Sequence, residues 1–199
     1  DGNTFAIGAT RNNGVNGDDS GHVRVYNLVT IPESVMDPND SWTQIGQDID
    51  GEAQEDYSGY SVSLSSDGNV IAVGAYKNDG NGVDSGHVRI YQYNSGQSQW
   101  SQLGQDIDGE AAEDYSGWSV SLSNDGNILA VGAYQNDGNG SNSGHIRVYQ
   151  YNSLPPVWGA SYTAITTPVV FNQQQTSPSI NVASISSNYL VAKPRTIEF

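Results

Sequence analysis

The chain has 199 residues, of which 22 are acidic and 7 basic, and its formal net charge is −15. It contains no cysteine, which excludes disulfide frameworks, thiolate metal sites and cysteine nucleophiles. A surface this acidic repels nucleic acid and anionic membranes and attracts cations, chiefly calcium. The same acidity could instead serve only to keep a β protein soluble and its edges unpaired.

Abundant Gly, Asn, Asp and Ser favour short strands joined by tight turns, and no window shows a sustained helical period. We therefore expect an all-β protein. Its strongest signal is an internal repeat with a shift of 58 residues: segment 47–53 returns as 105–111, and 56–65 returns as 114–123. A further copy begins at residue 1 with a longer loop. Repeats of this length are typical of propellers or arrays.

In chain order, the first copy enters at a hairpin turn. The complete copy is predicted to contain four strands, 59–65, 70–76, 87–93 and 100–107, with a tight turn at 67–69. The second strand is apolar on both faces, as expected for a strand sandwiched between neighbouring sheets. The third copy keeps register through Trp158 and Ile165, and 183–192 is a fainter echo.

Four strands per unit is the blade pattern of a β-propeller. The predicted fold class is all-β, a β-propeller of four-stranded blades with about three blades present. The predicted boundaries are a partial blade lacking its first strand (1–56), a full blade (57–114), a full blade with a divergent end (115–179) and the start of a degenerate blade (180–199). Three blades do not close comfortably. We therefore expect a segment of a larger propeller, with a ring of several copies or a filament as alternatives.

Three short elements recur in the same order in the copies: 57–62 and 115–120; 8–10, 74–76 and 132–134; and 21–26, 86–91 and 144–149. The first resembles the phenylalanine–glycine element, the second the GAP element and the third the strand that follows them in the FG-GAP repeat. This repeat is the propeller unit of integrin α-subunit heads and of many secreted proteins. The resemblance covers 1–165 well and 180–199 faintly. It implies an extracellular or cell-surface location.

Integrin-type blades carry a calcium loop between their first two strands, but here that connection is only 66–69 or 124–127, too short to supply six to eight oxygens. The next loops, 12–20, 78–85 and 136–143, alternate oxygen-bearing side chains with glycines in the manner of a calcium loop. The alternative is a turn whose side chains bond their own backbone. The metal ligands predicted on the first reading are Asp79, Asn81, Asp84, Asp137 and Asn139.

A second acidic cluster comprises Asp106, Asp108, Glu110, Glu113 and Asp114, with its copy Asp48, Asp50, Glu52, Glu55 and Asp56. These acids could bind a cation or pair with Arg89 or Arg147. A carboxylate pair also suggests glycosidase chemistry. Catalytic groups, however, are not normally copied into each repeat, so a solvated turn-forming loop is favoured.

The three histidines, His22, His87 and His145, share one repeat position, so none remains for a unique catalytic triad or a lone general base. We interpret them as strand-start residues that bond between strands, and expect no clustered metal ligation by them. Trp42, Trp100 and Trp158 open the fourth strands, and Trp118 lies opposite Tyr60. Such rings could stack on sugars, but packing between blades is favoured.

No catalytic constellation remains, so we predict that the chain is not an enzyme. The leading hypothesis is an extracellular or cell-surface module that binds a protein or glycan through the loops at one rim, because loops on a rigid scaffold usually carry recognition. Calcium is the one cofactor expected, with neither nucleic-acid binding nor membrane insertion. The alternative is a filament or coat subunit that assembles through open blade edges. A glycan hydrolase is the third reading.

Overall fold

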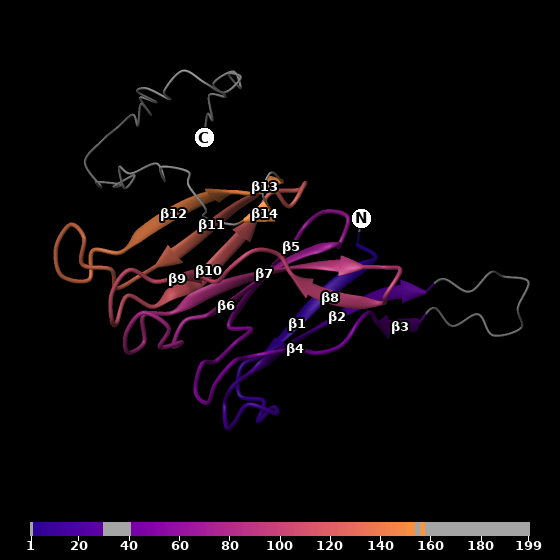
Figure 1. Cartoon of the computed structure of the whole chain (residues 1–199), viewed down its shortest axis with the longest axis horizontal. Helices are drawn as coiled ribbons and strands as arrows, with labels where there is room; N and C mark the ends of the chain where they lie inside the picture. Colours follow the sequence, from indigo (N-terminus) through magenta and orange to yellow (C-terminus); the bar gives the residue numbers. More distant parts are fainter. Residues whose placement is uncertain (1, 30–40, 154–155, 158–199) are drawn as a thin grey trace, which may run out of the picture.

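The computed structural model describes residues 2–29, 41–153 and 156–157. The described residues form only strands, turns and loops, and they include no helix long and apolar enough to cross a membrane. Three antiparallel sheets follow one another in chain order (Figure 1). The strands are β1 Thr4–Ala9, β2 His22–Val29, β3 Ser41–Gln44 and β4 Ile49–Asp50; β5 Ser61–Leu64, β6 Val70–Ala75, β7 His87–Asn94, β8 Gln99–Gln102 and β9 Ile107–Asp108; β10 Ser116–Leu122, β11 Ile128–Ala133 and β12 His145–Gln150; and a small hairpin of β13 Asn152–Ser153 and β14 Pro156–Val157.

The all-β class is confirmed, and the three sheets are propeller blades. The first contains β1 to β4, the second β5 to β9 and the third β10 to β12, and these strands lie within the predicted blade ranges. The sequence predicts a strand at 158–165, a divergent loop at 166–179 and the start of a degenerate blade at 180–199. These three segments lie outside the described residues.

The first three strands of the repeat form where the sequence predicted them, but the predicted fourth strand at 100–107 is not continuous. It is divided into β8 and β9, because Tyr91 pairs with Gln102 whereas Val88 pairs with Ile107. Two residues of β7, 89–90, therefore face four residues, 103–106. The surplus forms a bulge whose turn contains Gly104 at φ 85°. The bulge matters for the site because it projects Asp106 over β7.

The second blade is buried on both faces, which explains the apolar run in β6. On one side Ile71 and Val73 join a buried cluster with residues of the first blade. On the other side Ala72, Val88 and Ile90 join a buried cluster with Leu129 and Val131 of the third blade. The two clusters contain these buried residues: Val23, Val25, Ile49, Ile71, Val73 and Trp100 in one, and Ala72, Val88, Ile90, Ile107, Leu129 and Val131 in the other.

The two interfaces between blades have the same construction, in which backbones approach closely at glycine. A Cβ placed on Gly74 would overlap the carbonyl oxygen of Gly117 in the third blade, and a Cβ on Gly8 would overlap that of Gly59 in the second. The Gly117 carbonyl also accepts a hydrogen bond from Ser61 Oγ at 2.7 Å. The glycine of the GAP element is thus a contact point between blades, where any side chain would separate them.

Candidate functional site

The loops at one end of the sheets are joined across each blade interface by a buried carboxylate. Asp56, 3% exposed, accepts hydrogen bonds at Oδ2 from Asn78 Nδ2 and from the backbone N–H of Ala53, both at 3.0 Å. Burial raises the pKa of Asp56. Asp114 makes the equivalent bonds to Asn136 and Ala111 in the next copy. The acids at these two positions of the predicted acidic loops are therefore structural links.

The predicted calcium ligands lie in the β6–β7 and β11–β12 loops, and much of their bonding is to backbone. Asp79 Oδ1 accepts from the Asp84 N–H at 2.8 Å, and Asp137 Oδ1 accepts from the Asn142 N–H at 2.6 Å. Asn81 Nδ2 donates to two carbonyls of the 109–110 segment. These contacts match the turn alternative. Calcium binding at Asp79, Asn81, Asp84, Asp137 and Asn139 stays a prediction.

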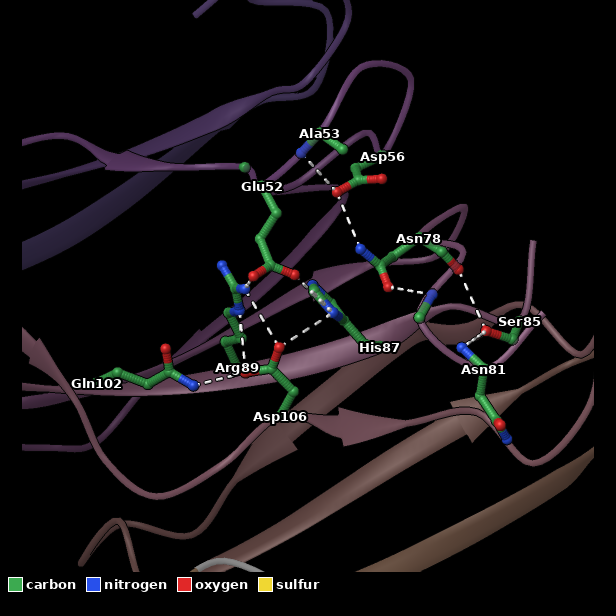
Figure 2. A network of polar contacts seen from close by, with 12 residues as sticks. Glu52, Ala53, Asp56, Asn78, Asn81, Ser85, His87, Arg89, Gln102 and Asp106 are labelled. Carbon is green, nitrogen blue, oxygen red and sulfur yellow. Dashed lines mark hydrogen bonds and ion pairs between the residues drawn. The ribbon is translucent and has the colours of Figure 1, made fainter. Parts of the chain in front are cut away.

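The histidines stand at the starts of β2, β7 and β12, where each meets carboxylates that are distant in sequence. His87 Nδ1 lies 3.7 Å from Glu52 Oε2 and 3.8 Å from Asp106 Oδ2. Glu52 comes from the loop that leaves the first blade, whereas Asp106 comes from the bulge of the second. Figure 2 shows both carboxylates pointing toward the imidazole. The structure also gathers His22, Asp48 and Asp50 within 4.8 Å of one another.

Arginine two residues after each histidine neutralises part of this charge, as the sequence suggested for Arg89. Arg89 forms two hydrogen bonds to Asp106, at 3.1 and 3.2 Å, and an ion pair with Glu52. Arg147 pairs with Glu110 of the preceding blade rather than with Asp106. In the first blade, Arg24 holds both oxygens of Asp48 at 2.9 and 2.7 Å, and these bonds lower the pKa of Asp48 to about 2.

Sequence reasoning treated the histidines separately and missed these clusters. The histidines themselves do lie on different strands. Each nevertheless meets acids of a neighbouring loop or bulge, and the bulge was read as plain strand. The signal available in the sequence was the spacing that the copies share. It did not suffice, because Glu52, His87 and Asp106 lie in three different parts of the repeat and come together only when blades stack.

A continuous row of six aromatic rings, here called the aromatic strip, crosses from the second blade to the third. Ring centroids are 4.5 Å apart for Tyr60–Tyr76, 4.6 Å for Tyr60–Trp118 and 4.4 Å for Trp118–Tyr134. Tyr60 and Tyr134 are 41% and 44% exposed. The strip comprises Tyr57, Tyr60, Tyr76, Tyr115, Trp118 and Tyr134.

The strip lies beside the loops expected to form the binding rim. The hydroxyl of Tyr57 lies 3.4 Å from Asp19 Oδ2, and that of Tyr115 lies 3.4 Å from Asp84 Oδ2. Lys77 stands 5.6 Å from the centre of the Tyr57 ring. Both tyrosines adopt φ 54°, an uncommon value for non-glycine residues that is held by bonds between neighbouring blades.

The tryptophans divide between packing and exposure. Trp100 is 2% exposed, its indole N–H donates to the Ile45 carbonyl at 2.9 Å, and it packs between the first two blades as predicted. Trp42 is 46% exposed and meets the Phe5 ring edge-on. Trp158 lies outside the described residues.

The stacked antiparallel sheets, joined by buried carboxylates and glycine contacts, define the described part of the chain as a series of β-propeller blades. The FG-GAP repeat family matches residues 48–91 and 107–149. These two segments are therefore FG-GAP repeats, and the resemblance inferred from the motifs is confirmed there. A search of curated proteins found no match. FG-GAP repeats form β-propeller modules of a kind that is often involved in binding or adhesion.

Proposed function

We propose that the chain is a non-catalytic, extracellular or cell-surface module that binds glycan through the aromatic strip and its flanking loops. The observation that carries the proposal is the strip itself. Four of its rings, Tyr60, Tyr76, Trp118 and Tyr134, form a connected surface across two blades, and two of them are more than two-fifths exposed. Contiguous exposed apolar surface rimmed by polar groups marks an interaction site.

The chemistry beside the strip favours a sugar over a purely apolar ligand. The C–H faces of a pyranose ring pack on aromatic faces, while its hydroxyl groups need hydrogen-bond acceptors and donors at the edge. Asp19, Asp84 and Lys77 supply these groups within reach of Tyr57 and Tyr115. A protein ligand is the other class expected for such a rim, and the binding experiment below distinguishes the two.

Several features support a non-catalytic role. Asp106, one of the carboxylates considered for glycosidase chemistry, has Oδ1 engaged by Arg89 and Gln102 and Oδ2 engaged by Arg89. A general acid must hold a proton and present it to the leaving group, and a carboxylate held by an arginine is unsuited to that role. The same arrangement is repeated at Asp48 in the first blade.

A glycan array followed by saturation-transfer NMR tests the proposal. The double variant Y60A/W118A removes the centre of the strip and is expected to abolish glycan binding. Trp42→Ala is the control, because it removes a ring on β3 that is about as exposed as Tyr60, 46% against 41%, and it should leave binding unchanged. Glycan binding that survives in Y60A/W118A would refute the strip as the site. Binding to deglycosylated protein targets alone would indicate a protein ligand.

A second candidate function, assembly through an open blade face, rests on the outer side of the third blade. Val88 and Ile90 of β7 are fully buried by the third blade, but their counterparts on β12, Ile146 and Val148, are 47% and 52% exposed among the described residues. Gly132 lies on the same face. The occupant that fits is the first strand of another blade, docking as β10 docks on β6. Light scattering on dilute protein checks this: a monodisperse monomer, unchanged in I146D, would remove the assembly candidate.

A further inference from the structure

The cluster around His87 contains an unsatisfied buried nitrogen. The His87 side chain is 3% exposed, and its Nδ1 is the one buried side-chain nitrogen or oxygen among the described residues without a hydrogen-bond partner. Buried polar atoms are normally paired, and each exception calls for a physical explanation. Here the unpaired atom faces two carboxylates from two different blades, as Figure 2 shows.

The distances are too long for hydrogen bonds and close to those between two ligands of one metal ion. Nδ1 lies 3.7 Å from Glu52 Oε2 and 3.8 Å from Asp106 Oδ2, whereas an N–H···O bond is usually ~2.7–3.2 Å long. Two atoms bound tetrahedrally at about 2.0–2.2 Å from zinc lie roughly 3.4 Å apart. Movements of a few tenths of an ångström would therefore bring Nδ1 to this spacing from each of the two carboxylate oxygens. All three ligand atoms lie within 4.8 Å of one another.

The charge around the cluster accommodates a dication despite the presence of Arg89. The Arg89 guanidinium forms an ion pair with Glu52 Oε1 and hydrogen bonds to both Oδ1 and Oδ2 of Asp106. These contacts hold the two carboxylates in place, and Glu52 Oε2 remains directed toward His87. Hydrogen-bonded ligand carboxylates are usual around protein-bound metals. With two carboxylates against one arginine and a neutral imidazole, the group carries an excess of negative charge.

We propose that Glu52 Oε2, His87 Nδ1 and Asp106 Oδ2 form a binding site for a divalent transition metal ion of the zinc class, at the junction of the first two blades. One imidazole with two carboxylates suits zinc better than calcium, which prefers a larger all-oxygen set. Three protein ligands leave a position open for water. The ion would link a loop of one blade to the strand and bulge of the next.

The third blade provides an internal comparison. His145 Nδ1 lies 3.6 Å from Glu110 Oε2, and Arg147 pairs with Glu110, so this part of the arrangement is copied. The residue 58 positions after Asp106, however, is Ala164, which has no ligand atom. The third copy thus has two of the three ligands, and it should bind zinc far more weakly.

Titration calorimetry of the chelator-treated chain with ZnCl2 near neutral pH tests the site. E52Q and H87Q are each expected to weaken zinc binding at this site at least about tenfold. E55Q is the matched control for the first, because Glu55 is an exposed acid of the same loop, and H145Q is the control for the second. Thermal melts of each variant check that it is folded, and E52Q changes a partly exposed side chain should H87Q fail to fold.

Long-range 1H–15N spectra of the histidine side chains give the second readout. Zinc should shift the His87 Nδ1 resonance of the wild-type chain and leave that of His145 in place, and CaCl2 should shift neither. The absence of zinc binding, a His87 resonance that does not respond, or unchanged affinity in the folded E52Q variant would overturn the proposal.

Discussion

Gly74→Ala tests the glycine contact between blades with a single methyl group. A Cβ at this position would lie 3.0 Å from the carbonyl carbon of Gly117 and closer still to its oxygen, which Ser61 Oγ also contacts. The Cβ would also lie 2.4 Å from Ser61 Oγ, which can rotate away, but the Gly117 carbonyl is backbone. The third blade must therefore move by roughly 1 Å, and the Ser61 bond is lost if the hydroxyl rotates. Gly74 has no positive φ, and the effect therefore comes from the contact and not from backbone strain.

Overpacking of this kind costs about 1–3 kcal/mol, and the gain of about 0.4–1 kcal/mol from restricting the unfolded chain offsets part of it. In a chain of this length each kcal/mol lowers Tm by about 2–4 °C. Urea denaturation followed by tryptophan fluorescence gives the change directly. Gly132→Ala is the control at the same position of the next blade. Its Cβ would overlap only Ser119 Oγ, at 2.4 Å, which can rotate away, and it would meet no backbone atom closer than 3.8 Å, so its effect should be near zero or slightly stabilising. Equal destabilisation by both substitutions, or by neither, would refute the reasoning.

Three further predictions concern packing and ionisation. Trp100→Ala should cost about 3–5 kcal/mol because the ring is buried between blades, whereas Trp42→Ala should cost far less; urea midpoints that agreed for the two would contradict this. Arg24 lowers the pKa of Asp48 from 3.8 to about 2, so this ion pair stabilises the fold above pH 3.8, and the stabilisation is lost as the pH falls toward 2. Asp48→Asn should therefore lower the urea midpoint near neutral pH and make the midpoint decline less steeply over that acid range. Burial lowers the pKa of His145 below 6.5, so the unfolded state binds more protons and stability falls as the pH drops through 6.5; His145→Gln should reduce that fall, and an unchanged pH profile would count against it.

Local patterns in the sequence were sufficient for the repeat, the strand order and the family. The run at 70–76 is apolar on both faces, which predicts a strand that is covered on both sides. The two buried clusters confirm this prediction, because β6 contributes residues to both. The turn at Gly68 also follows from residue type alone, since its φ is 71°. These features depend on residues close together in the chain.

The site depended on contacts between distant residues, and those were not predictable in the same way. The bulge at 103–106 contains two more residues than the segment of β7 that it faces, and nothing in the alternation of polar and apolar residues indicates it. The bulge nevertheless brings Asp106 close to His87. Glu52 reaches the same histidine only because the next blade stacks on its own. The aromatic strip likewise combines Tyr60 with Trp118, which are distant in sequence and become neighbours through the stacking.

Native-state hydrogen exchange at the Ser58 and Ser116 amides tests the stacking of the blades most directly. Each N–H donates across an interface, Ser58 to the Ser20 carbonyl at 3.0 Å and Ser116 to the Ser85 carbonyl at 2.9 Å. If the sheets stack as described, both amides should exchange as slowly as those of β6 and β11. Exchange at the rate of an open loop, alongside protected strands, would show that the sheets fold separately and would contradict the account.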